Sequence, residues 1–106
     1  MSTTASGAPR HLSSSSRAWY ETVLADFDLE PHHIRLLQLA AEAWDRGQEA
    51  RQLLAQSGVV IPDRFGVPRA HPAVAIERDS RIAFARLVRE LDLDGEPAPD
   101  PRPKRL

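Results

Sequence analysis

The sequence contains no cysteine among its 106 residues, so disulfide bonds, thiol nucleophiles and cysteine-based zinc sites are excluded. It also lacks long hydrophobic runs. No stretch approaches the roughly 20 apolar residues that span a bilayer, and the N-terminus has no apolar core of signal-peptide length. These absences predict a soluble, cytoplasmic protein with no membrane partner.

Residue signatures of catalysis are missing as well. No glycine-rich phosphate loop follows a strand, and no serine stands in a nucleophile elbow. The carboxylates are spread among arginines, a pattern typical of surface ion pairs rather than of a catalytic acid. His32 and His33 are neighbours on a predicted helix, where their side chains point in different directions and cannot share one metal ion. We therefore predict that the chain is not an enzyme and binds no cofactor or metal.

The net charge of −1 hides an uneven distribution. Residues 1–58 contain five arginines and seven acids, whereas residues 59–89 contain six arginines and three acids. A basic second half can attract a polyanion even when the whole chain is nearly neutral. The alternative interpretation is a solvated surface of ordinary ion pairs.

A long amphipathic helix is predicted over residues 31–57, with Pro31 at its first position and Gly58 as a left-handed cap. Its apolar residues recur at spacings of three and four. The face that they form includes Leu37, Ala40, Trp44 and Gly47. Small residues in the middle of this face allow a second backbone to approach closely. That backbone belongs either to another helix of this chain or to a neighbouring copy.

The predicted fold is all-α, with three helices over about residues 16–27, 31–57 and 72–92. β-branched residues around an Asp/Gly turn predict a short β-hairpin at about residues 59–69, before the last helix. Phe65 lies in this hairpin and is expected to rest on the helices or on another subunit. Phe84 and Leu87 belong to the apolar stripe of the last helix.

We expect one helical domain over residues 13–94, flanked by disordered tails at 1–12 and 95–106. The first tail consists largely of small and polar residues, and the second is rich in proline and charge. A folded region of about 80 residues is only marginally supplied with buried surface, which predicts a homo-oligomer. The residues predicted to form the core or the oligomer interface are Leu37, Ala40, Trp44, Gly47, Phe65, Phe84 and Leu87.

Four arginines are the candidates for contact with DNA phosphates. Arg64 and Arg69 lie in the predicted hairpin, and Arg78 and Arg81 lie in the first turns of the last helix. Arginine at such positions can grip phosphate. The sequence contains no clear helix-turn-helix, zinc finger or aromatic stacking platform, so these arginines are chosen by charge and position alone.

The order of these features resembles a known family. A long helix ends at Leu53-Leu54-Ala55-Gln56-Ser57-Gly58, a hairpin segment with a central Gly66 follows, His71-Pro72 opens the last helix, and Leu91-Asp92-Leu93 ends it. This layout, over about residues 17–94, is similar to that of the compact small terminase subunits of tailed double-stranded DNA phages and prophages. The chain departs from the family at two places, where Asn-Pro and Leu-Gly-Leu are common.

The resemblance implies a ring-forming homo-oligomer without enzymatic activity, located in the host cell cytoplasm. Such a protein recognises double-stranded viral DNA for genome packaging and passes it to the terminase large subunit, which carries the ATPase and nuclease activities. The segment from Glu96 to Leu106 is a candidate for contact with the large subunit or the portal, folding on binding. An inert solubilising tail is the alternative.

Two other functions are compatible with the sequence. The first is a small helical adaptor that binds other proteins and has no affinity for DNA. The second is a compact transcription regulator, which would be a dimer on a palindromic site but lacks the turn between two short helices that such proteins use. The number of subunits and the DNA sequence recognised do not follow from the residues.

Overall fold

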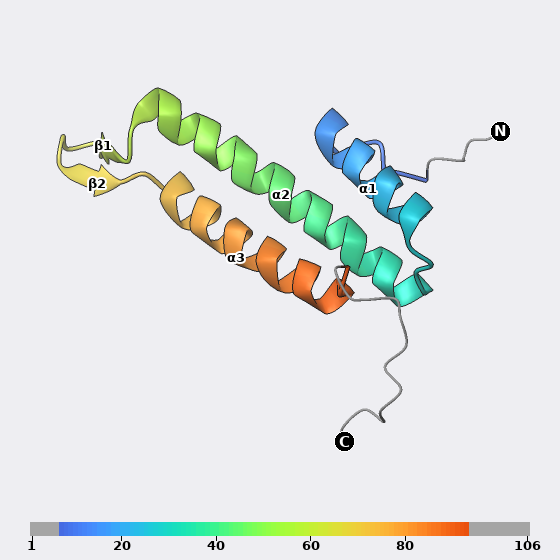
Figure 1. The fold of residues 1–106 in the computed structure, drawn as a ribbon. Helices are drawn as coiled ribbons and strands as arrows, with labels where there is room; N and C mark the ends of the chain where they lie inside the picture. The colour runs from blue at the N-terminus through green and yellow to red at the C-terminus, as the bar shows by residue number, and fades with distance from the viewer. Residues whose placement is uncertain (1–6, 94–106) are drawn as a thin grey trace, which may run out of the picture.

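The computed structural model describes residues 7–93, which form three helices and a two-stranded antiparallel sheet. The elements are α1 (Ser14–Asp26), α2 (Pro31–Ser57), β1 (Val60–Pro62), β2 (Pro68–Ala70) and α3 (Ala73–Leu91). Helix α2 is central, α3 runs back along it in the antiparallel direction, and α1 lies on α2 near its first half (Figure 1). The hairpin projects beyond the far end of α2. The predicted order of three helices with a hairpin before the last is confirmed.

Local signals explain the ends of the helices. The side chain of Ser13 accepts a hydrogen bond from the Ser16 N–H at 3.2 Å, so α1 begins two residues earlier than predicted. Pro31 opens α2 after Glu30, and Gly58 ends it with φ +83° and an N–H that donates to the Leu54 carbonyl at 2.7 Å. The predicted bounds of α2 are therefore confirmed.

The first residue after α3 has an unusual backbone conformation. Asp92 follows Leu91 in the left-handed region, with φ 56° and ψ 46°, and its N–H donates to the Val88 and Arg89 carbonyls at 3.1 Å. Among residues 7–93 it is the only residue other than glycine with positive φ. Left-handed caps favour glycine because a Cβ atom is crowded there.

Helices α2 and α3 meet through small side chains. Ala40 and Ala50 of α2 are buried, as are Ala73 and Ser80 of α3. A Cβ atom placed on Gly47 would lie 3.4 Å from the Ser80 Cβ, so the two helices approach closely at this point. Of the two partners considered for the small-residue face of the long helix, the structure places another helix of the same chain there.

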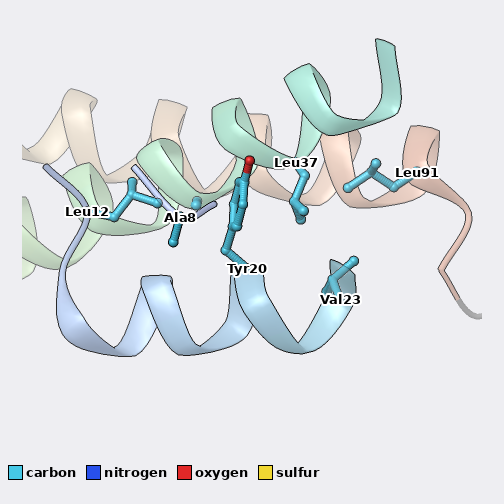
Figure 2. Close-up of a cluster of buried hydrophobic side chains, with 7 residues drawn as sticks. Ala8, Leu12, Tyr20, Val23, Leu37 and Leu91 are labelled. Carbon is cyan, nitrogen blue, oxygen red and sulfur yellow. The ribbon is translucent and has the colours of Figure 1, made fainter. Parts of the chain in front are cut away.

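The apolar core joins all three helices to the segment that precedes them. It consists of Ala8, Leu12, Tyr20, Val23, Leu37, Ala41 and Leu91. Tyr20 stands between α1 and α2, with Ala8 and Leu12 beside it (Figure 2). The expectation of a disordered tail over residues 1–12 is wrong for residues 7–12, because Ala8 and Leu12 bury apolar surface against the helices. Residues 1–6 and the expected tail at 95–106 lie outside the described residues.

The close approach at Gly47 predicts that Gly47→Leu destabilises the fold by about 1–3 kcal/mol, because the larger side chain would force α2 and α3 apart. Gly47→Ala is the matched control. Its methyl group would meet Ser80 at an ordinary contact distance, and alanine favours helix over glycine by about 1 kcal/mol. Urea unfolding followed by circular dichroism measures both variants. Equal stability of the two variants would contradict tight packing at this crossing.

The left-handed cap predicts that Asp92→Gly stabilises the protein by about 0.5–1 kcal/mol, because glycine removes the crowding of Cβ at positive φ. The change also removes a negative charge from the negative end of the α3 dipole. Asp79 is an exposed residue within α3, away from its ends, and Asp79→Gly should instead destabilise the protein by about 1 kcal/mol. Thermal unfolding compares the two. A lower melting temperature for Asp92→Gly would contradict the conformation of this cap.

Candidate functional site

The four arginines predicted to bind DNA are all exposed, but most of them are paired with acids. Arg69 Nε lies 3.3 Å from Asp63 Oδ2, and Arg78 Nε lies 3.2 Å from Asp79 Oδ1. Arg81 Nη1 lies 3.6 Å from Glu77 Oε1. Pairing lowers the local positive charge, and such exposed pairs contribute little to stability. The four arginines therefore do not form a continuous basic patch.

Arg64 differs from the other three because it makes no ion pair in the described part of the chain. Its guanidinium carbon lies 5.4 Å from the centre of the Phe65 ring, in the loop between β1 and β2. This distance allows a cation–π interaction. The full positive charge of Arg64 is thus presented at the end of the hairpin.

A cluster of two arginines around one glutamate forms where α2 and α3 lie side by side. Glu77 of α3 is contacted by Arg51 of α2 at 3.4 Å and by Arg81, one turn further along α3, at 3.6 Å. One partly buried carboxylate is shared by two exposed guanidinium groups, which leaves one positive charge in excess. Sequence analysis missed Arg51 because it stands 26 residues from Glu77, and no local spacing links the two helices at this point.

The hairpin is organised by the carboxylate of Asp63. Its Oδ1 accepts hydrogen bonds from the N–H groups of Phe65 and Val67, at 2.8 and 2.9 Å. The Asp63 N–H donates to the Val67 carbonyl at 2.9 Å, and Gly66 supplies the positive φ that the turn requires. β1 and β2 pair in the register Val60 with Ala70, Ile61 with Arg69 and Pro62 with Pro68. The loop is therefore held in one conformation even though its side chains are exposed.

These hydrogen bonds also change the acidity of the carboxyl group. The N–H groups of Val67 and Phe65 stabilise the charged form of Asp63 and hold its pKa below the ordinary value of 3.8, and Arg69 acts in the same direction. Because the folded-state pKa is lowered, the carboxylate supports the hairpin at neutral pH. That support is lost as the pH falls through the lowered pKa.

Three aromatic side chains, one from each helix, line an apolar depression beside the start of α1. The rings of Trp44 and Phe84 have centroids 5.1 Å apart, and those of Trp19 and Phe84 are 5.8 Å apart, both in tilted arrangements. With Ser15 and Ser16 they line an open pocket of about 280 Å³, which we call the aromatic pocket. Trp44 keeps 44% of its surface exposed there.

A polar network beside the aromatic pocket fixes the start of α1 on α2. Asp45 Oδ1 accepts hydrogen bonds from the hydroxyls of Ser13 and Ser16 at 2.7 and 2.6 Å, and Oδ2 accepts one from the Ser13 N–H at 2.7 Å. Burial raises the pKa of Asp45, but these hydrogen bonds and the nearby His11 outweigh burial and leave that pKa below its ordinary value. The pocket wall contributed by α1 is thus anchored by a charged group.

His11 lies within the ordered structure, although the sequence placed it in a disordered tail. Its Nε2 is 2.7 Å from Glu42 Oε2, on the surface of α2.

The centroids of the His32 and His33 rings are 4.1 Å apart. Residues 7–93 contain no group of three or more histidine, aspartate or glutamate side chains that could hold a metal ion.

The residues predicted for the core or the oligomer interface divide into three groups. Leu37 and Ala40 are completely buried within the chain. Gly47, Phe84 and Leu87 are half-buried. Trp44 and Phe65 remain exposed, and Phe65 does not rest on the helices of its own chain, since 79% of its surface is open. Contact of Phe65 with another subunit stays a prediction.

Exposed apolar side chains extend well beyond these two residues. They also occur on α2, in the hairpin and on α3, and include Leu39, Leu53, Val59, Val60, Val67, Ile76 and Ile82. In contrast, Leu37 is the only large side chain with almost no exposed surface in the described part of the protein. None of the three helices is long and apolar enough to cross a bilayer.

Comparisons with protein-family models, curated proteins and solved structures found no match to this chain.

The geometry of the hairpin predicts that Asp63→Ala frees the loop without unfolding the helices, because the N–H groups of Phe65 and Val67 lose their acceptor. Amide hydrogen exchange of these two groups should become faster, while exchange within α2 stays unchanged. Asp79→Ala is a control, since among the described residues that carboxylate pairs only with Arg78. In the wild-type protein, an NMR titration of the Asp63 carboxyl should show a midpoint below 3.8. A midpoint at or above that value would contradict the hydrogen bonding of the loop.

Proposed function

We propose that this chain is the small terminase subunit of a tailed phage or prophage. It would be a non-catalytic homo-oligomer that binds double-stranded viral DNA and regulates the large subunit, which carries the ATPase and nuclease activities. The observation that carries the proposal is the arrangement of α2 and α3 as a helical hairpin from whose end an ordered β-hairpin projects. This arrangement agrees with the layout of the family that the sequence resembles.

The conformation of Asp92 adds support to the resemblance. The family commonly has Leu-Gly-Leu where this chain has Leu91-Asp92-Leu93. Asp92 adopts the left-handed conformation for which glycine is the preferred residue. The departure from the family pattern therefore changes the residue while the backbone keeps the conformation that a glycine there would supply.

The exposed apolar surface supports an oligomer. A chain of this size buries little of its apolar surface, and here α2 and α3 meet largely through alanine, glycine and serine. Large apolar side chains are left open on both helices and on the hairpin. Association with further copies would remove part of this surface from water, as in the homo-oligomers that many small domains form.

Positive charge on the hairpin side of the molecule supports contact with DNA. Arg64 and Arg69 lie in the hairpin, and Arg51, Arg78 and Arg81 lie on the adjoining turns of α2 and α3. Phosphate groups could replace Asp63, Glu77 and Asp79 as partners of these arginines. Repetition of the same cluster around an oligomer would add up the phosphate contacts, although one copy supplies few.

The pairing of these arginines with acids favours a second function. Arg69, Arg78 and Arg81 each contact a carboxylate, so much of the positive charge on the hairpin side is already paired within one copy. A helical adaptor that binds other proteins through its exposed apolar surface would need no further positive charge. The alternative function is therefore such an adaptor, with no affinity for DNA.

Light scattering distinguishes the two functions. The purified protein is measured alone and with duplex DNA, at 50 and 200 mM salt. We expect a mass several-fold above the 11.8 kDa of one chain, and binding to DNA that weakens as salt rises. A monomer that ignores DNA at low salt would overturn the terminase proposal and leave the adaptor.

The proposed DNA surface predicts that Arg78→Gln with Arg81→Gln weakens DNA binding. If both arginines contact phosphate, the slope of log K against log salt should fall by about 2, because each lost contact removes nearly one unit. Arg35→Gln is the control, since Arg35 is an exposed arginine at the opposite end of α2 from the hairpin. Fluorescence anisotropy with a labelled duplex measures the slope. An unchanged slope in the double variant would exclude these two arginines from the DNA contact.

A further inference from the structure

The most exposed large apolar side chain of the described residues belongs to Phe65, at the projecting end of the hairpin. It stands on a loop that the Asp63 carboxylate already holds in one conformation. A rigid loop loses little conformational freedom when it docks, so an aromatic ring presented in this way is suited to enter a pocket.

The aromatic pocket offers a matching cavity. Its lining is mostly apolar, it is open to solvent, and Trp19, Trp44 and Phe84 can surround an additional ring at tilted angles. A volume of about 280 Å³ is close to the lower end of the range for pockets that hold small aromatic ligands. No described side chain of the chain itself fills it.

Phe65 cannot reach the aromatic pocket of its own chain. Trp44 lies 13 residues before the end of α2, which corresponds to about 20 Å along the helix axis. The hairpin begins directly after that end and points away from α1 (Figure 1). Both of its connections, at residues 58–59 and 71–72, are too short to let it fold back along the helices. Any occupant with this ring must therefore come from a second copy.

Charges beside the ring and beside the pocket are complementary. Arg64 accompanies Phe65 and makes no ion pair among residues 7–93. A shallow depression that shares Ser15 and Trp44 with the aromatic pocket carries Glu49, which is exposed and makes no ion pair within the described structure either. An opposite pair that forms only on docking would orient the hairpin and disfavour other partners.

We propose that the hairpin of one copy docks on the next copy, with its Phe65 in the aromatic pocket and its Arg64 paired with Glu49. The two contacting surfaces are different parts of the molecule, so the contact is head-to-tail. Repetition of a head-to-tail contact closes into a ring when its rotation allows. The inference rests on the proposed function for the ring, and it assigns Arg64 to the subunit contact while leaving Arg69, Arg78 and Arg81 available to DNA.

Two variants separate the halves of this contact. Phe65→Ser removes the inserted ring but keeps the pocket, and Ser15→Trp fills the pocket but keeps the ring. Ser15 is exposed, so the larger side chain does not overpack the core. We expect each variant to have the mass of one chain by light scattering. Equimolar mixing should restore one intact contact and give a species of two chains that grows no further.

Leu53→Ser is the matched control for loss of an exposed apolar side chain. Leu53 is as exposed as Trp44 and stands nine residues further along α2, on the opposite face at about 180°. It should keep the wild-type mass, and circular dichroism should show the same helix content in all variants. A wild-type mass for Phe65→Ser, loss of the oligomer in Leu53→Ser, or no pairing in the mixture of folded variants would overturn the proposal.

A charge exchange tests the orientation. Arg64→Glu and Glu49→Arg should each weaken association by about tenfold, and the double exchange should recover most of the loss. If the double variant loses as much association free energy as the two single variants together, the pairing is overturned.

Measuring DNA binding by the wild-type protein separates failure of the hairpin contact from failure of the proposed function. A wild-type oligomer that binds DNA, together with an unaffected Phe65→Ser oligomer, would overturn only the hairpin contact. A wild-type monomer that ignores DNA would overturn both proposals.

Discussion

The close approach of α2 to α3 is the constraint on which the rest of the structure depends. Gly47 and Ser80 leave so little space between the helices that the facing positions must be small, as Ala40, Ala50 and Ala73 are. A seam of small residues buries backbone and methyl groups but few large side chains. Several large apolar residues of both helices consequently lie on other faces, where a single copy leaves them exposed.

The position of α1 follows from the same constraint. Since the seam supplies little apolar burial, the core forms at the other end of α2, where Tyr20 and Val23 meet Leu37 and Leu91. Asp45 adds a polar anchor through Ser13 and Ser16. This docking brings Trp19 beside Phe84, and the aromatic pocket exists only because α1 is held at that place.

The sequence was sufficient to predict the elements, since helical spacing, Pro31, Gly58 and the Asp63 to Gly66 turn are local signals. It predicted the small-residue contact but left its partner open, because periodicity identifies a face and not what covers it. It failed at residues 7–12, where a composition typical of disorder hides Ala8 and Leu12 as core residues. The site was predicted less well. The Arg51 to Glu77 pair and the Trp19 to Phe84 contact join residues from different helices, and no spacing within one element indicates such contacts.

The two surfaces left open by the fold differ in what they demand of a partner. The arginines on the hairpin side already have carboxylates as partners, so a polyanion must compete for them, and a single copy gains little from that exchange. The aromatic pocket and Phe65 have no such competitor among the described residues, and their burial in the proposed contact would gain the full apolar contribution. Assembly should therefore come first energetically. In the proposed oligomer, DNA would then meet many weakly paired arginines at fixed spacing, and multivalency rather than the charge of one chain would provide the affinity.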